Sequence, residues 1–121
     1  MDMRSVYIMD KKAALIDNFY HMHKDFRYLH SIHLCRNEEE FYSYNLDIIL
    51  VDRRMSERKM SIHFSGVVDF KSIKLDSLYV LSISIVDVSA DQMEGLHYKV
   101  KEDEHELFSF YCDSFSCKMV R

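Results

Sequence analysis

Two aspartates in this chain stand at positions where their carboxylates could do chemistry. Asp10 and Asp52 each follow a short apolar run, and the run before Asp52, residues 48–51, has no polar interruption. Such a run is typical of a strand buried on both faces of a parallel sheet. The crevice beyond the carboxyl ends of such strands is where ligands bind. The alternative is that Asp52 caps the turn that follows its strand.

One of the serines in the apolar run of residues 78–86 and Lys101 would join these two carboxylates at one edge of a five-stranded α/β unit. Clustered carboxylates bind a hard cation such as Mg²⁺ through oxygen ligands. A carboxylate beside that cation can accept a phosphoryl group, and a hydroxyl and an ammonium can hold the added oxygens. Such a set of residues could therefore bind a hard cation and accept a phosphoryl group at the edge of a sheet.

The elements that must position these residues alternate between strand and helix patterns. Leu15, Phe19 and Met22 recur at helical spacing and predict a helix over residues 11–26. We predict strands over residues 5–9, 28–35, 46–52, 78–86 and 96–101, and further helices over 37–45, 60–73 and 104–119. This alternation implies right-handed crossovers and a parallel sheet. The expected fold is one three-layer α/β/α domain that spans residues 1–121.

The order and spacing of the chemical residues resemble the receiver (CheY-like) domain of bacterial two-component response regulators, over nearly the whole chain. The resemblance implies a flavodoxin-like strand order, 2-1-3-4-5, here with a shortened fourth helix. It also implies a role for each residue: Asp52 is the phosphoacceptor, Asp10 a metal-binding acid, Ser82 the switch hydroxyl (with Ser84 as the other candidate), Lys101 the invariant lysine and Tyr98 the aromatic switch.

The chain departs from the receiver pattern at several positions. Lys11 stands where the resemblance places a second metal-binding acid, and its ammonium repels Mg²⁺. Ser56 and Glu102 replace prolines that shape two loops. We therefore expect an atypical receiver with a weak Mg²⁺ site at Asp10 and Asp52, no other cofactor, and weak or absent phosphorylation.

Composition excludes several other classes of function. A net charge of −4 argues against nucleic-acid binding, and no apolar run approaches the ~20 residues that cross a bilayer. The three cysteines, Cys35, Cys112 and Cys117, form no CxxC pair and are odd in number, which indicates reduced thiols in a cytoplasmic protein. The seven histidines show no spacing that suits zinc.

The receiver interpretation predicts a signalling domain without enzyme activity. Its partner would be a histidine kinase or an output domain in transcription regulation, and the apolar terminal helix around Phe108, Tyr111 and Phe115 could form a homodimer surface. One alternative is a phosphorylation-independent adaptor on the same fold. Another is a small hydrolase that uses Asp10 and Asp52, although no nucleophile elbow or glycine-rich phosphate loop accompanies them.

Overall fold

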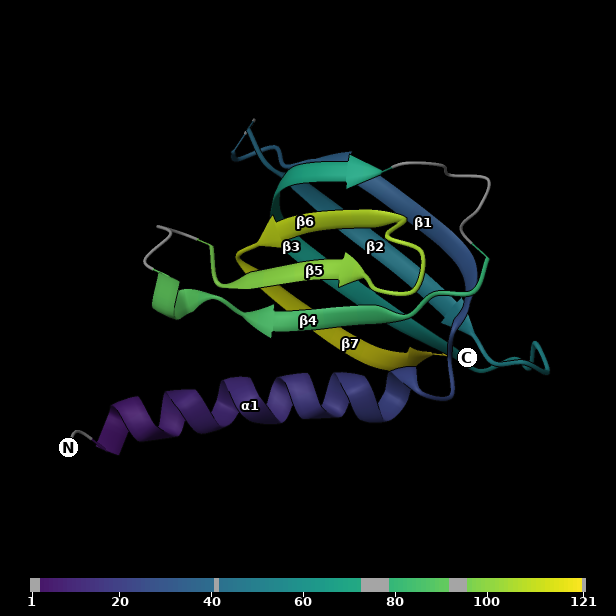
Figure 1. The fold of residues 1–121 in the computed structure, drawn as a ribbon, viewed down its shortest axis with the longest axis horizontal. Helices are drawn as coiled ribbons and strands as arrows, with labels where there is room; N and C mark the ends of the chain where they lie inside the picture. The colour runs from purple at the N-terminus through teal and green to yellow at the C-terminus, as the bar shows by residue number, and fades with distance from the viewer. Residues whose placement is uncertain (1–2, 41, 73–78, 92–95, 121) are drawn as a thin grey trace.

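A computed structural model describes residues 3–40, 42–72, 79–91 and 96–120 of the chain. Over these residues the chain forms one long helix, a single 3₁₀ turn and seven strands, all paired antiparallel (Figure 1). The elements are α1 (Met3–His23), β1 (Tyr28–Arg36), β2 (Tyr44–Val51), β3 (Lys59–Ser72), β4 (Ile83–Asp87), η2 (Ser89–Asp91), β5 (Tyr98–Glu102), β6 (Phe108–Cys112) and β7 (Ser114–Val120).

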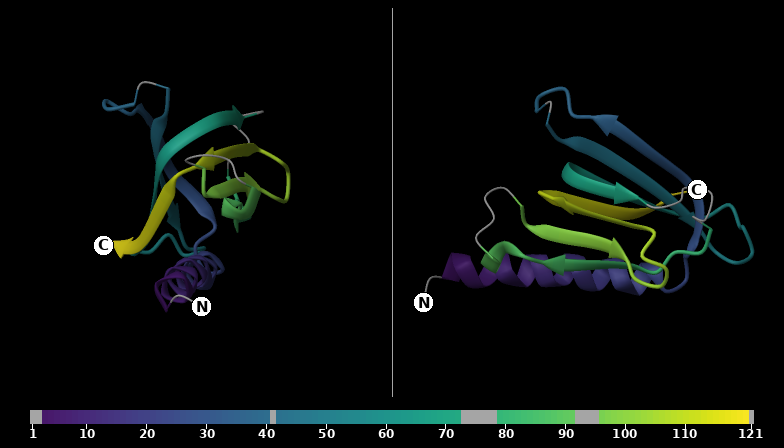
Figure 2. Two further views of the ribbon diagram at one scale, coloured as in Figure 1. Left: turned by 90° about the vertical axis from the view of Figure 1, so that its left-hand side faces the viewer. Right: turned by 45° about the horizontal axis from the view of Figure 1, so that its top comes forward.

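The long strand β3 belongs to both halves of a folded sheet. Its first part pairs with β2 and β7, and its last part pairs with β6. The strand order is β1-β2-β3-β6-β5-β4, with β7 added beside β3. The first half of the sheet consists of β1, β2, β3 and β7, and the second half of β3, β6, β5 and β4. The two halves face each other, and α1 runs along their open side (Figure 2).

The sheet bends where Gly66 of β3 meets Asp113, the residue between β6 and β7. Gly66 has a φ of +66°, and the backbone N–H of Asp113 donates to the Ser65 carbonyl at 3.0 Å. A Cβ placed on Gly66 would lie 2.8 Å from the Cβ of Asp113. Both the backbone conformation and the available space therefore require glycine at this position.

Replacing Gly66 with alanine is expected to lower the free energy of unfolding by about 2 kcal/mol, through left-handed strain and crowding against Asp113. Urea unfolding of the Gly66→Ala and wild-type chains measures this difference. Ser65→Ala, one residue earlier, serves as the control and should change stability little. An unchanged midpoint for Gly66→Ala would show that the bend tolerates a side chain.

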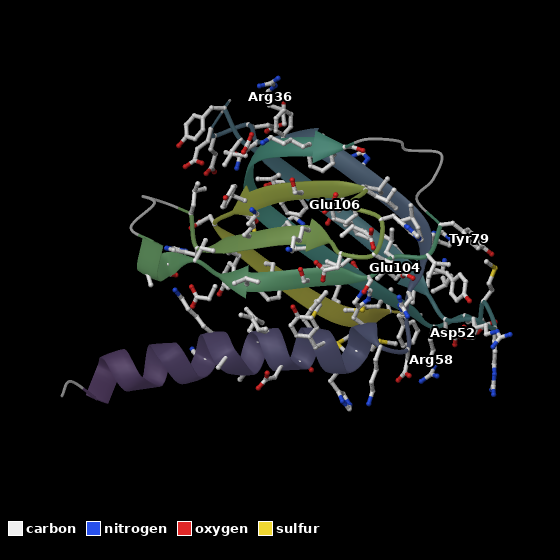
Figure 3. The ribbon with its side chains drawn as sticks, in the orientation of Figure 1. Arg36, Asp52, Arg58, Tyr79, Glu104 and Glu106 are labelled. Carbon is white, nitrogen blue, oxygen red and sulfur yellow. The ribbon has the colours of Figure 1, made fainter. Side chains whose placement is uncertain are left out.

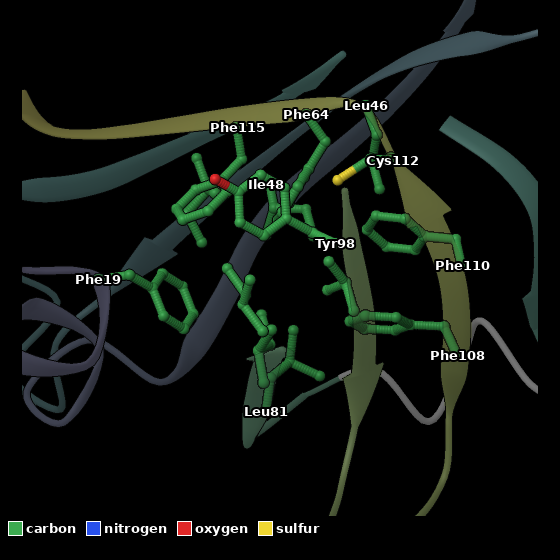
Figure 4. Close-up of a cluster of buried hydrophobic side chains, with 14 of the residues drawn as sticks. Phe19, Leu46, Ile48, Phe64, Leu81, Tyr98, Phe108, Phe110, Cys112 and Phe115 are labelled. Atoms are coloured by element: carbon green, nitrogen blue, oxygen red, sulfur yellow. The ribbon is translucent and has the colours of Figure 1, made fainter. Parts of the chain in front are cut away.

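Aromatic rings fill the space between the two halves of the sheet and α1 (Figure 4). The rings of Phe64 and Phe110 meet edge to face at 5.0 Å, and Tyr98 meets Phe115 in the same way, also at 5.0 Å. Phe19 brings α1 into this core, 6.2 Å from the Phe115 ring. Such pairs add to the stabilisation that burial of apolar area provides.

Polar side chains of α1 bind the backbone of β4, the last strand in the order of the second half. The Ile85 N–H donates to the Tyr20 hydroxyl at 2.9 Å, and that hydroxyl lies 3.2 Å from the Ile85 carbonyl. The Ile83 N–H donates to His23 Nε2 at 2.9 Å. The helix thus takes the place of a further strand and satisfies a sheet edge that would otherwise be free to pair with another chain.

The predicted three-layer α/β/α fold with a parallel sheet in the order 2-1-3-4-5 is wrong. Residues 37–43 and 52–58 are the connections between β1, β2 and β3, and each is shorter than the crossover of a dozen or more residues that parallel strands need. The ranges 5–9, 60–73 and 104–119 also differ from prediction, since the first lies in α1 and the others are mainly strands. The strands predicted over 28–35, 46–52 and 96–101 are present.

Candidate functional site

The residues of the predicted phosphoryl site lie on separate elements. Asp10 lies within α1, and Asp52 lies in the connection between β2 and β3. Ser82 immediately precedes β4, where Ser84 is the register partner of Lys101 in β5. Within the described residues, no hydrogen bond or ion pair joins Asp52 to Ser82, Ser84 or Lys101. The structure therefore assembles no receiver-type site from them.

Tyr98, the predicted aromatic switch, is part of the core. Its side chain is buried, and burial raises the pKa of its phenol. Lys101 is exposed, with its Nζ 3.8 Å from an oxygen of Asp103. Lys11 lies on α1 and is also exposed. Tyr98 is thus a core residue and Lys101 lies near Asp103, so neither takes the switch position that the receiver resemblance implied.

Glu102 is a buried carboxylate that organises the turn after β5. Its oxygens accept N–H groups from Ser82 at 2.9 Å, from Glu104 at 3.1 Å and from His105 at 2.7 Å. Burial raises the pKa of this carboxyl, but the backbone donors together outweigh burial and hold the pKa below its ordinary value. Glu102 therefore ties the β5–β6 turn to the start of β4 and has a structural role.

Asp52 caps the turn that follows β2, as the alternative interpretation proposed. Its carboxylate accepts the Ser56 N–H at 3.1 Å and the Ser56 hydroxyl at 2.9 Å, and its carbonyl accepts the Met55 N–H at 3.0 Å. The Ser56 N–H and hydroxyl lower the pKa of Asp52. The carboxylate therefore stays ionised near neutral pH and fixes the conformation of the turn.

This turn presents Met55 to solvent at one end of the molecule. Met55 has a φ of +50°, which is uncommon for a residue other than glycine, and its side chain is 62% exposed. Beside it, a hollow of ≈520 Å³ is bordered by Leu29 and Val51. Tyr79 is 61% exposed and packs edge to face on Tyr28 at 5.6 Å.

Three arginines lie in this turn or directly after it. Arg53 and Arg54 belong to the turn and are exposed, and Arg58 follows it, with its guanidinium carbon 6.0 Å from the centre of the Phe26 ring. Figure 3 shows Arg58, Asp52 and Tyr79 at the same end of the protein. We call this surface the Met55 patch and define it by Tyr28, Arg53, Arg54, Met55, Arg58 and Tyr79.

A second polar cluster lies on the outer face of the first half of the sheet. Asp47 Oδ1 lies 2.7 Å from His63 Nδ1, and His63 Nε2 lies 3.2 Å from Ser65 Oγ. The order acid, imidazole, hydroxyl is that of a nucleophilic triad. Acyl transfer depends on preorganised donors in a water-excluded site, however, and the Asp47 and His63 side chains remain 42% and 43% exposed. We interpret the cluster as a hydrogen-bonded surface row.

The outer face of the second half carries three lysines around an open hollow of ≈450 Å³. Lys71 lies 3.7 Å from Asp69, and Lys101 lies near Asp103 as described above. The ammonium of Lys99 lies 5.4 Å from the centre of the Tyr111 ring. Each lysine therefore has a neighbour that offsets or contacts its charge, whereas Arg53 and Arg54 of the Met55 patch form no ion pair within the described residues.

No group of three or more His, Cys, Asp or Glu side chains in the described part of the chain could hold a metal ion. The expected Mg²⁺ site depended on Asp10 and Asp52, which lie on α1 and in the β2–β3 connection. The three cysteines are free thiols. The described helices are not long and apolar enough to span a membrane.

Comparison with known proteins identifies the family. The family model described as "Immunity protein PIM8" matches residues 11–118, almost the whole chain. This chain belongs to the PIM8 immunity protein family. No curated protein and no solved structure gives a significant match. Membership of an immunity protein family implies, in general terms, that the partner of this chain is a protein, a toxin.

The PIM8 match and the antiparallel fold together correct the receiver interpretation. A phosphoacceptor role for Asp52, a switch at Ser82 and Tyr98, a histidine kinase or output-domain partner and a role in two-component transcription regulation all depended on that resemblance. The expected homodimer surface also loses its basis, because Phe108 and Phe115 lie buried in strands instead of on a terminal helix.

Glycine in place of Met55 is expected to raise the free energy of unfolding by about 1 kcal/mol, because glycine adopts a φ of +50° without steric cost. Thermal unfolding measures the change as an increase in Tm. Met55→Ala keeps the left-handed strain and serves as the control. A lower Tm for Met55→Gly would show that the Met55 side chain stabilises the fold.

Proposed function

We propose that this chain neutralises a toxin by binding it directly, as a non-enzymatic inhibitor that needs no cofactor. The observation that carries the proposal is the match to the PIM8 immunity protein family over residues 11–118. Neutralisation by binding means that the chain occupies its toxin, and this requires a stable, complementary surface.

The structure supports binding in preference to catalysis. The polar clusters of the sheet faces are open to water, whereas catalytic groups work in water-excluded sites. The large aromatic core and the hydrogen bonds between α1 and the edge strand β4 give a rigid scaffold. A rigid scaffold reduces the entropy lost when a partner binds. The free thiols support action in the cytoplasm, where glutathione keeps cysteines reduced.

Co-expression in a bacterial host tests this proposal. Each open reading frame that neighbours the gene for this chain is expressed alone, and any product that arrests growth is treated as a candidate toxin. We expect the chain to restore growth against one of these products and to co-elute with it in gel filtration. The control is a Phe64→Asp variant, which places a charge in the core and should fail to protect. Failure of the wild-type chain against every toxic product contradicts the proposal.

A further inference from the structure

We propose that the Met55 patch is the surface that binds the toxin, and that it fits an acidic protein surface with an apolar pocket for the Met55 side chain. This inference rests on the proposed function and adds the place of binding and the chemistry of the partner. Three independent features of the patch carry it: the conformation of its turn, its exposed apolar side chains and its charge.

The turn holds Met55 in an unfavourable conformation. A non-glycine residue in the left-handed region has a steric cost, and it persists only where its surroundings fix it. Here Asp52 fixes it, through the bonds to Ser56 and to the Met55 N–H described above. Strain of this type clusters at binding sites. Asp52 therefore acts as a positioning residue that keeps Met55 ready for contact.

The patch carries two of the most exposed large hydrophobic side chains in the described part of the chain. The most exposed large hydrophobic residues in the described part of the chain are Tyr42 at 74%, Met55 at 62% and Tyr79 at 61%. Two of these three, Met55 and Tyr79, belong to the patch, and Met55 borders the ≈520 Å³ hollow. Tyrosine, methionine and arginine are enriched at protein interfaces, and a few such residues provide most of the binding energy.

The patch is positively charged on a negatively charged protein. Residues 52–59 contain four basic and two acidic side chains, a local net charge of +2, while the whole chain carries −4. Within the described residues, no ion pair involves Arg53 or Arg54. Arginine binds carboxylates through two parallel hydrogen bonds. The charge of the patch therefore complements an acidic surface.

Affinity measurements with matched variants test the inference. The probe is an inactive form of the toxin identified by co-expression, titrated calorimetrically with the full chain. Tyr79→Ala and Arg54→Glu should each raise Kd by about tenfold or more, and Met55→Gly should do so while raising Tm. The controls are Tyr42→Ala, an exposed tyrosine in the connection at the opposite end of β2, and Lys71→Glu on the second half of the sheet, both expected within about twofold of wild type.

The outcomes separate this inference from the proposed function. If the toxin binds but the patch variants bind within about twofold of wild type, or if the control variants weaken binding equally, the Met55 patch is not the binding surface and the proposed function still stands. If the chain binds no toxin, the proposed function fails and the inference fails with it. Because Met55→Gly should be more stable than wild type, weak binding by this variant cannot come from unfolding.

Discussion

Replacing Glu102 with alanine is expected to lower the free energy of unfolding by about 3 kcal/mol. The substitution removes a carboxylate that is 1% exposed and leaves the N–H groups of Ser82, Glu104 and His105 without their acceptor. Hydrogen bonds to charged groups are worth roughly 1.5–3 kcal/mol each, and partial access of water to the turn offsets part of the sum. Urea unfolding followed by circular dichroism measures the change.

Glu104 provides the matched control for this prediction, because it lies in the same turn and is half exposed. Its carboxylate forms an ion pair with Arg27 at 3.2 Å on the surface. Surface ion pairs contribute about 0–1 kcal/mol, so Glu104→Ala should change stability little. Equal destabilisation by the two substitutions would contradict the role assigned to the buried carboxylate.

The free energy of unfolding is expected to fall as pH drops below about 6.5, because His23 is buried in its neutral form. Burial lowers the pKa of this side chain, and the Phe26 carbonyl opposes that shift only in part. The Ile83 N–H donates to Nε2, so Nδ1 carries the proton that is donated to the Phe26 carbonyl at 3.0 Å. Protonation of Nε2 would break the bond to β4 and put a charge in the core.

The direction of this effect follows from proton uptake on unfolding. Since the folded pKa of His23 is lower than the unfolded one, the unfolded chain binds more protons below pH 6.5. The contribution of neutral His23 to the free energy of unfolding is complete above the pKa that His23 has in the unfolded chain. It is lost as pH falls toward the lower pKa of the folded chain, by up to ~1.4 kcal/mol per pH unit. The pKa of Glu102 is also lowered in the folded chain, so the stability that this carboxylate contributes is lost as pH falls below the ordinary pKa of a glutamate.

Urea titrations between pH 5 and pH 8 measure the His23 effect. The His23→Leu chain should be less stable at pH 8 and should lose most of the slope between pH 5 and 6.5. His21→Leu is the control, because His21 lies two residues earlier on α1 and is exposed. It should keep the wild-type slope. A full slope in His23→Leu would assign the pH dependence to other groups.

The sequence predicted residues 11–23 of α1 and several strands, and it failed where apolar residues show a helical spacing and an alternating pattern in the same segment. Leu107, Tyr111 and Phe115 are spaced by four residues, which suits one face of a helix. In the structure Leu107 precedes β6, Tyr111 lies in β6 and Phe115 lies in β7. The pattern that corresponds to a strand is the alternation of Phe108, Phe110 and Cys112. The segment 60–73 was predicted as a helix, although Met60, Ile62 and Phe64 alternate with polar residues as they do in a strand with one buried face.

Local chemistry was predictable where the global fold was not. Asn37 stands at the start of the helix that the sequence predicted over residues 37–45. Its side chain accepts the N–H groups of Glu39 and Glu40, at 2.9 and 3.3 Å, as the cap of a helix does. The cap instead begins the turn of a β-hairpin. In the same way, Asp52 was singled out for chemistry and serves as the cap of a turn. Asparagine and aspartate stabilise turns and helix starts by the same bonds, so the residue type alone does not distinguish them.

The Met55 patch was not predictable, because its parts come from distant positions in the sequence. Tyr79 reaches the patch because its carbonyl accepts the Leu29 N–H at 2.8 Å and its neighbour Val80 pairs with Tyr28. That contact links segments about fifty residues apart and depends on the antiparallel fold. The only local signals were the pair Arg53-Arg54 and the capping pair Asp52 and Ser56.

The central claim is that this member of the PIM8 family neutralises a toxin by binding it. Titrating a fixed concentration of the purified, active toxin with the chain tests this most directly. We predict that toxin activity falls linearly and reaches zero near one equivalent of the chain, at once and without dependence on incubation time. Progressive loss of toxin activity at far less than one equivalent would reveal an enzyme, and undiminished activity at excess chain would contradict neutralisation by binding.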